Sequence, residues 1–145
     1  MSMEVIRATE EHQRAGAYYV RIQAMARQHH IPLQEEFDAI DGPGCRYIVV
    51  LDDGFPVATC RWFEVGPGEA EIGRVVVLPE WRGRQLGQLV MRQAEAWIRE
   101  SGYRKIVLSA RVGVDPFYEK LGYRCNAARE AHSGTFQCVF MEKAL

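Results

Sequence analysis

The stretch "RVVVLPEWRGRQLGQLVMRQAEAWI", residues 74–98, contains the strand, loop and helix that decide the fold. Its apolar run at residues 75–78 is typical of a buried strand. The loop that follows is rich in arginine and glycine. Beyond the loop, apolar side chains recur at helical spacing: Leu86, Leu89, Val90, Ala94, Trp97 and Ile98. The pattern therefore predicts a strand that leads through a positively charged loop into an amphipathic helix, which stops at Gly102.

Further strands are expected on both sides of this unit. Strand character is found in residues 46–51, 56–64 and 70–78, which are separated by the turn signals "DDG" and "GPGE". These turns have hairpin lengths, so the three segments predict an antiparallel meander. Residues 105–110 return as a strand after the helix. Because a helix crosses over between them, strands 70–78 and 105–110 should run parallel.

The N-terminal part predicts a short strand and a long helix. Residues 4–8 have strand character, and Thr9 offers a hydroxyl that can cap a following helix. The helix ends before Pro32, and its apolar face consists of Ala15, Tyr18, Ile22, Met25 and Ala26. The acidic segment "LQEEFDAIDGPG" follows and predicts a partly helical loop.

The C-terminal part predicts one more helix and two strands. Asp115 is expected to cap a short helix that has Pro116 in its first turn and ends at Gly122. Strands are expected near Tyr123 and at residues 135–141. The whole chain therefore predicts an α+β domain, a three-layer α/β arrangement in which helices cover a mixed sheet.

Length and composition are those of an ordinary soluble globular protein. A chain of 145 residues is most simply one domain, residues 1–145. The formal net charge of -1 argues against a general nucleic-acid binder. The apolar runs are far shorter than the roughly 20 residues of a membrane span, and no signal-peptide pattern precedes them. We therefore expect a cytoplasmic protein that binds neither nucleic acid nor membrane.

Cysteine and histidine spacing gives no indication of a metal site. The four cysteines lie far apart without a C-x-x-C pair: Cys45, Cys60, Cys125 and Cys138. They are interpreted as reduced thiols, mostly in the core. His29 and His30 precede Pro32, where capping or solvation of a helix end accounts for them. No metal is expected.

The loop between the central strand and helix is suited to bind phosphate. Unpaired backbone N–H groups converge at a helix N-terminus, and the helix dipole adds positive potential there. Gly83 and Gly87 allow the main chain to approach an anion, while Arg82 and Arg84 supply charge. Neither a P-loop nor a dinucleotide-binding fingerprint is present in the sequence. A turn with solvated arginines remains the alternative interpretation.

Two blocks in the sequence resemble the GNAT superfamily of acyl-CoA-dependent N-acetyltransferases. The family pattern [Q/R]-x-x-G-x-[G/A] falls on "RGRQLG", residues 82–87, with Gln85 where glycine is usual. "DPFYEKLGY", residues 115–123, is similar to the family's "PFYEKLGF". Upstream, "YYVRIQAMARQHHIPLQEEFD" and "LSAR" resemble a subgroup with "YxVRxxVFxxEQxxP" and "LNAQ" or "NAR" segments. In "LSAR", Ser109 stands where asparagine is common.

The resemblance implies a GNAT-like, mostly antiparallel sheet of six to seven strands with a splayed parallel pair, and acetyl-CoA as co-substrate. The pantetheine arm would pair with residues 75–77, and the pyrophosphate would lie on the amides of residues 82–88. The implied cofactor-binding residues are Val75, Val76, Val77, Arg82, Gly83, Arg84, Gln85, Leu86, Gly87, Gln88 and Ser109. The valines alone indicate only a buried strand.

Acetyl transfer to an amine requires an oxyanion donor, an acid and a base. The resemblance implies that Tyr118 protonates the departing thiolate and that a backbone N–H near Val75 or Val76 holds the oxyanion; packing beside Phe117 is the alternative for Tyr118. Glu71 is the preferred candidate base and Glu64 the second, although a solvated glutamate is the alternative for each. Some relatives carry polar groups where this chain has Gly73 and Cys138, which leaves His132 as a further candidate.

The acceptor is expected to be a small molecule with a primary amine. Arg21 and Arg111 match positions where relatives that act on anionic amines carry arginine; a solvated helix face and a strand end are the alternatives. The acidic "EEFDAID" instead favours a cationic amine. Two other functions fit the sequence, a catalytically silent acyl-CoA sensor and a protein N-acetyltransferase. A homodimer is possible, since many GNAT proteins are dimers.

Overall fold

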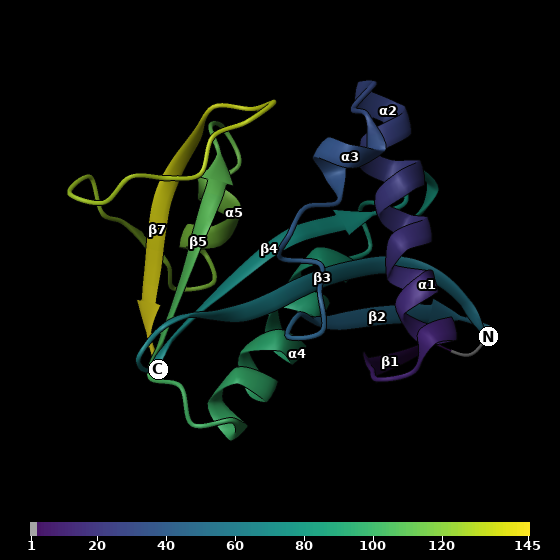
Figure 1. The fold of residues 1–145 in the computed structure, drawn as a ribbon, viewed down its shortest axis with the longest axis horizontal. Helices are drawn as coiled ribbons and strands as arrows, with labels where there is room; N and C mark the ends of the chain where they lie inside the picture. The colour runs from purple at the N-terminus through teal and green to yellow at the C-terminus, as the bar shows by residue number, and fades with distance from the viewer. Residues whose placement is uncertain (1–2) are drawn as a thin grey trace.

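The computed structural model describes residues 3–145, which form one seven-stranded sheet with helices on both faces (Figure 1). The strand order in the sheet is β1-β2-β3-β4-β5-β7-β6. The strands are β1 (Met3–Ala8), β2 (Arg46–Asp52), β3 (Phe55–Gly66), β4 (Glu69–Val77), β5 (Lys105–Arg111), β6 (Arg124–Cys125) and β7 (Cys138–Ala144). All neighbouring pairs are antiparallel except β4 and β5, which are parallel. The predicted meander and crossover are therefore both confirmed.

The helices divide between the two faces of the sheet. The N-terminal helical segment consists of α1 (Glu11–Arg21), a π-helical turn (Ile22–Ala26) and α2 (Arg27–His29). The others are α3 (Leu33–Glu36), a 3-10 turn (Pro79–Trp81), α4 (Leu86–Glu100) and α5 (Asp115–Glu119). Side chains of a strand alternate between its two faces. Tyr47 and Val49 accordingly pack with Ala17 of α1, whereas Ile48 and Val50 belong to the core cluster that contains Val90 of α4.

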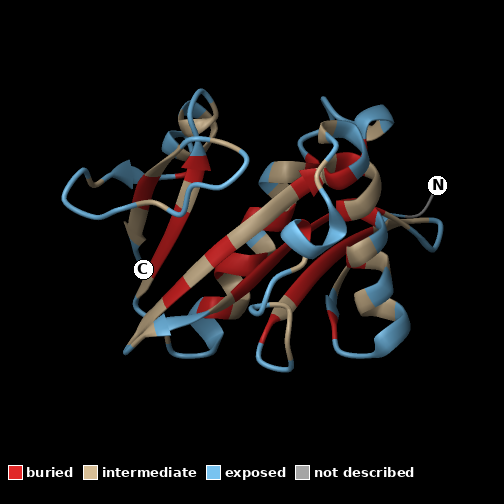
Figure 2. Ribbon diagram, turned by 45° about the horizontal axis from the view of Figure 1, so that its top comes forward, coloured by how far each residue is buried: buried red, intermediate tan, exposed pale blue. Residues whose placement is uncertain are grey.

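The core lies along the central strands (Figure 2). The indole of Trp62 in β3 is fully buried and meets the rings of Trp97 and Tyr103 edge-on, both at 5.6 Å. Trp97 lies on the apolar stripe of α4 that the sequence predicted. This packing fixes α4 against the sheet, and with it the loop from which α4 starts.

The parallel pair β4 and β5 separates after its first three residues. The register joins Glu69 to Lys105, Ala70 to Ile106 and Glu71 to Val107. Both strands continue beyond this point without pairing to each other, and Figure 1 shows them diverging toward their C-terminal ends. The splay that the family resemblance implied is therefore present, and it creates an open space inside the sheet.

Two helix-cap predictions need correction. Helix α1 is capped at Glu10 rather than Thr9, because the side chain of Gln13 accepts hydrogen bonds from the backbone N–H of Thr9 and of Glu10. Asp115 is the first residue of α5 rather than its N-cap, and its carboxylate accepts a hydrogen bond from the N–H of Gly113.

The last strand begins at Cys138 instead of residue 135. The cysteines are free but not mostly in the core: Cys45 and Cys60 are buried, Cys138 is half-buried and Cys125 is exposed.

Candidate active site

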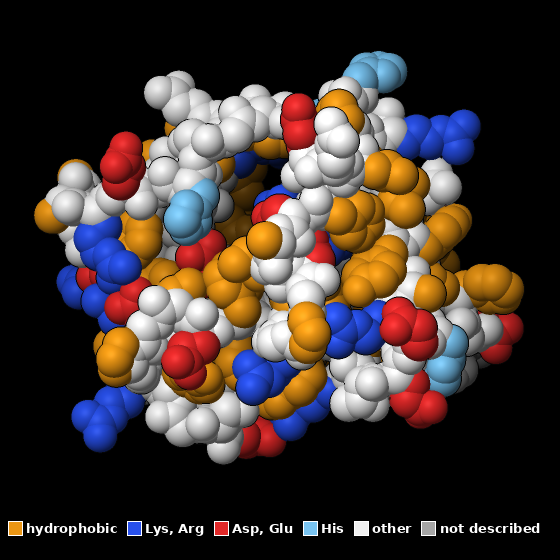
Figure 3. All heavy atoms as spheres, in the orientation of Figure 1, with side chains coloured by type: hydrophobic (Ala, Val, Ile, Leu, Met, Phe, Trp, Pro, Cys, Tyr) orange, Lys and Arg blue, Asp and Glu red, His pale blue; other side chains and the backbone are white. Residues whose placement is uncertain are grey.

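A cleft of about 900 Å³ lies where β4 and β5 part. It opens on the face shown in Figure 3, between the β5 and β7 side of the molecule and the α2 and α3 side. A smaller cavity of about 430 Å³ adjoins it, lined by Val75, Val76 and Val77 of β4, the end of the N-terminal helix and α5. The residues shared by both are Met25, Val75, Arg111, Val114 and Tyr118. Val75 and Tyr118 therefore lie at the junction of the two spaces.

Tyr118 lies on α5 and is held by other aromatic rings. Its ring meets Phe117 edge-on at 5.0 Å and Tyr123 at 6.1 Å. Burial raises the pKa of the Tyr118 phenol above its usual value, and the nearby Cys60 thiol adds to the increase. The phenol therefore stays protonated at neutral pH and can donate a hydrogen bond or a proton at the junction.

A β-bulge interrupts β4 at the same level. The register joins Thr59 to Val76 and Arg61 to Gly73, so Arg74 and Val75 together stand opposite one residue of β3. Arg74 has a φ of 52°, a left-handed conformation that is unusual for arginine. Among the described strand pairings, Val75 has no partner in either β3 or β5. The bulge thus removes Val75 from the ladder where it borders both cavities.

The arginine- and glycine-rich loop precedes α4, as predicted. Gly83 and Gln85 both have positive φ, of 80° and 62°, and Gln85 is the N-cap of α4. The left-handed conformation at Gln85 explains why glycine suits this position. The side chain of Leu86 is buried in the core, so only its main chain is available to a ligand, whereas the side chain of Gln88 is exposed.

The two arginines of this loop are held by protein groups. Arg82 donates to the carbonyl oxygen of Val77 at 3.1 Å and to the side-chain oxygen of Gln28 at 3.1 Å. The Arg84 guanidinium lies 4.3 Å from the centre of the Trp81 ring. Arg82 therefore lies against the end of β4 beside the smaller cavity.

Replacing Gln85 by glycine is expected to raise the free energy of unfolding by up to about 1 kcal/mol. The left-handed conformation costs a non-glycine residue roughly 1–2 kcal/mol, from which the larger backbone entropy loss of glycine is subtracted. Denaturant unfolding measures the change. The matched control is Gln88→Gly, an exposed position inside α4, which should lower stability by about 1 kcal/mol. Equal losses in the two variants would contradict the expectation.

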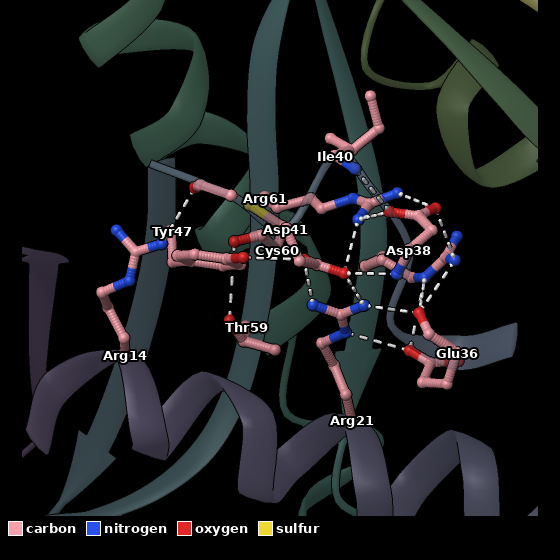
Figure 4. A network of polar contacts seen from close by, with 12 residues as sticks. Arg14, Arg21, Glu36, Asp38, Ile40, Asp41, Tyr47, Thr59, Cys60 and Arg61 are labelled. Carbon is pink, nitrogen blue, oxygen red and sulfur yellow. Dashed lines mark hydrogen bonds and ion pairs between the residues drawn. The ribbon is translucent and has the colours of Figure 1, made fainter. Parts of the chain in front are cut away.

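Arg21 does not line the cleft, and its predicted role in binding substrate needs correction. The side chain is completely buried. Its Nε donates to Glu36 at 2.9 Å and its Nη1 to Asp41 at 2.7 Å, while Nη2 donates to the Glu36 carbonyl oxygen at 2.7 Å (Figure 4). These bonds occupy the guanidinium and hold residues 36–41 against α1. A solvated helix face, the alternative interpretation, is also wrong.

Two further arginines, which the sequence did not single out, complete this network. Arg61 of β3 pairs with Asp38 at 2.8 Å and Asp41 at 3.0 Å, and Arg74 of β4 pairs with Glu36 and Asp38, both at 3.3 Å. Three carboxylates of the acidic segment are thus neutralised by three arginines. The segment forms one wall of the cleft, but these acids attract a cationic acceptor less strongly than the sequence indicated.

Glu71 and His132 meet inside the cleft. Glu71 Oε1 lies 3.4 Å from His132 Nε2, and both residues line the larger space. Burial raises the pKa of Glu71, and the nearby histidine only partly offsets this increase. The main-chain N–H of His132 donates to Ser109 Oγ at 2.8 Å.

The remaining candidates occupy different positions. Glu64, the other predicted base, is not among the lining residues, and it accepts a hydrogen bond from the Tyr103 hydroxyl at 2.6 Å. Ser109 lines the larger space and not the smaller one beside residues 75–77. Arg111 is exposed, borders both spaces and lies 4.6 Å over the ring of Phe136.

This arrangement can be compared with known proteins. The family model described as "Acetyltransferase (GNAT) family" matches residues 7–123. The chain belongs to the GNAT acetyltransferase family. It is 30% identical over 128 residues to the uncharacterized N-acetyltransferase YjcF of Bacillus subtilis (strain 168), covering 88% of this chain and 90% of YjcF. The GNAT protein described here is thus an acyltransferase.

Solved structures agree with the GNAT fold. A protein of Lactobacillus plantarum assigned as an N-acetyltransferase superposes with a TM-score of 0.90 and 28% identity, covering 100% of this chain and 99% of that chain. The PaiA N-acetyltransferase of Thermoplasma acidophilum, solved with coenzyme A, has a TM-score of 0.74 and 15% identity, with 100% of both chains covered. At 15% identity, the similarity to PaiA shows a shared fold and nothing more.

Residues 3–145 contain no cluster of three or more His, Cys, Asp or Glu side chains that could hold a metal ion. Within the same residues, no helix is long and apolar enough to cross a membrane.

Proposed function

We propose that this GNAT protein transfers the acetyl group of acetyl-CoA to the primary amine of a small molecule, by direct attack of the amine on the thioester. One observation carries the proposal. The separation of β4 from β5 opens two connected spaces that meet at Val75 and Tyr118. A thioester at this junction would have its cofactor on one side and the acceptor on the other.

The smaller cavity suits the cofactor. A pantetheine arm beside residues 75–77 would face the unpaired edge of β4, where main-chain groups are free to bond it. The pyrophosphate would lie on the N–H groups of residues 82–88, because the start of α4 offers unpaired donors and a positive dipole end. Arg82 and Arg84 lie on the same loop and add positive charge. The coenzyme A complex of the fold neighbour PaiA supports this choice of cofactor.

The two spaces together supply the groups that acyl transfer needs. The N–H of Val75, released from the ladder by the bulge, would stabilise the oxyanion of the tetrahedral intermediate. Tyr118 would give its proton to the departing thiolate, because its phenol remains protonated at neutral pH. Glu71 lines the cleft, has no arginine partner within 4.0 Å in the described chain, and has a raised pKa that suits a base.

The larger space suits a small acceptor. Residues of the acidic segment form one wall and the loop between β6 and β7 forms the other, so the amine would enter between them. Arg111, which has no carboxylate within 4.0 Å among the described residues, would bind an anionic group of the acceptor. Glu35 and Glu71, on the same lining, favour the ammonium end of that molecule.

The test is thiol release from acetyl-CoA by the purified protein. The acceptor panel comprises amino acids, aminophosphonates, polyamines and aminoglycosides, and a blank without acceptor corrects for hydrolysis. Acceptor-dependent release with one class is the expected result. Tight binding of acetyl-CoA without release by any acceptor would instead support an acyl-CoA sensor. A protein that does not bind acetyl-CoA would contradict the proposal.

A further inference from the structure

The base of the proposed reaction must reach the amine near Val75, and Glu71 is far from it along the strand. Val75 lies four positions beyond Glu71 in β4, which corresponds to about 13 Å in an extended strand. Glu71 lies at the last paired position, where β4 and β5 begin to part, whereas Val75 lies at the open end. A general base must come within roughly 2.6–3.2 Å of the proton, directly or through one water. A second group is therefore needed between them.

His132 approaches Glu71 from the open-end side. Its main chain is bonded to Ser109, which lies two residues beyond Val107, the β5 partner of Glu71. This anchor is therefore about 7 Å closer to the open end than Glu71 is. From there the imidazole reaches back until Nε2 is 3.4 Å from Glu71 Oε1. Three segments, β4, β5 and the β6–β7 loop, thus converge on one histidine in the cleft.

We propose that His132 accepts the proton of the attacking amine, with Glu71 orienting the imidazole and Ser109 positioning its loop; this inference rests on the proposed acetyl transfer. When the Nε2 hydrogen points at Glu71, the lone pair of Nδ1 is free. A carboxylate that orients an imidazole in this way also stabilises the imidazolium that forms. Glu71, assigned above as a base, then acts through His132.

The step balances without any further reactant. The alkyl amine arrives as an ammonium ion, and one N–H bond breaks with the electron pair left on nitrogen. That proton passes to Nδ1 of His132, and from there to solvent, because 80% of the His132 side chain is exposed. The nitrogen then forms a bond to the acetyl carbon and releases a second proton to solvent as the amide forms. The carbon–sulfur bond breaks, and the thiolate takes the Tyr118 proton, which solvent replaces. The products are the acetamide and free CoA.

A surface ion pair is the competing explanation for the same geometry. An ion pair with so exposed a histidine contributes little to stability, and its loss has no effect on chemistry. His132→Gln should therefore fold normally under either explanation. The two explanations differ only in the rates they predict for the variant. If His132 is the base, the rate falls more with an amine that must lose a proton before it attacks than with an amine that is already neutral.

The experiment compares two nucleophiles with the full-length protein and acetyl-CoA. One is the most active primary alkyl amine of the panel, which is protonated at neutral pH; the other is hydroxylamine, which is unprotonated. In His132→Gln, the ratio of the alkyl amine rate to the hydroxylamine rate is expected to fall roughly 10²-fold, the size of a general-base contribution. Added imidazole should restore part of the alkyl amine rate, because the site is open to solvent.

Further variants test which residues contribute to this ratio of rates. Glu71→Gln and Ser109→Ala should lower the same ratio by smaller factors, with an unchanged KM for acetyl-CoA. Glu4→Gln and His12→Gln, at exposed positions outside the cleft lining, should leave this ratio unchanged.

An unchanged ratio in His132→Gln, or equal losses with both nucleophiles, would overturn the role of His132 and leave acetyl transfer intact. A wild-type protein active with hydroxylamine alone would also overturn it. Failure with every amine, hydroxylamine included, would count against acetyl transfer itself.

Discussion

Replacing Tyr118 by phenylalanine is expected to lower kcat about 10²-fold or more, because the departing thiolate loses its proton donor. The substitution removes a single oxygen. The ring contacts with Phe117 and Tyr123 remain, so the fold and the junction of the two cavities should be retained. Burial raises the pKa of the phenol, so the wild-type enzyme keeps this proton throughout the neutral range. The loss in the variant should therefore be similar from pH 6 to pH 8.

Steady-state thiol release with the best acceptor, together with calorimetric binding of acetyl-CoA, measures this effect. The dissociation constant of acetyl-CoA should change less than about threefold, since an interaction made only in the transition state affects kcat and not binding. Tyr19→Phe, an exposed tyrosine of α1 outside the cleft, is the control. If Tyr118→Phe retained full kcat, Tyr118 would be a packing residue and the thiolate would leave without an acid.

The sequence predicted best those elements whose structure is set by residues close together in the chain. The helical spacing from Leu86 to Ile98 and the turn signals around β3 are local, and they predicted α4 and the meander with small errors at the ends. The loop before α4 was predicted for the same reason. Its geometry even explains the unusual Gln85, which adopts the left-handed conformation expected of a glycine.

Contacts between residues far apart in the chain could not be predicted in this way. The Arg21 side chain is committed to carboxylates 15 and 20 residues away, and nothing in the helical pattern of α1 distinguishes it from a substrate-binding arginine. The bulge at Arg74 gave no signal because arginine is not a residue that favours positive φ. Arg61 does lie within a continuous buried run of β3, residues 57–62. An arginine in such a run indicates a buried ion pair.

Replacing Arg21 by methionine is expected to lower the free energy of unfolding by about 3–5 kcal/mol, because Glu36 and Asp41 are left buried without their main partner. Methionine keeps much of the volume, so the loss reflects charge more than packing. Denaturant unfolding at pH 7 measures it. The matched control is Arg7→Met, which breaks an equally short pair with Glu100 on the surface and should cost far less.

The pH dependence of the stability lost in Arg21→Met shows whether the loss comes from a buried charge network or from packing. Burial alone would raise the pKa of Asp41, but hydrogen bonds from Arg21 and Tyr47 outweigh it and hold the pKa well below its usual value. In the wild-type protein, the contribution of Asp41 to stability is therefore complete above the unfolded pKa of about 4 and decreases as the pH falls below it.

The variant should lose less stability on acidification than the wild type does. Without Arg21, the folded pKa of Asp41 should rise, because only Tyr47 and Arg61 then oppose the effect of burial. Protonation of Asp41 therefore relieves the buried charge at a higher pH in the variant, so acidification from pH 7 to pH 3 should narrow the stability difference between wild type and Arg21→Met. A difference that stayed constant over this range would mean that Arg21 stabilises residues 36–41 by packing, for example through its contact with the Phe37 ring at 4.3 Å, and not by charge.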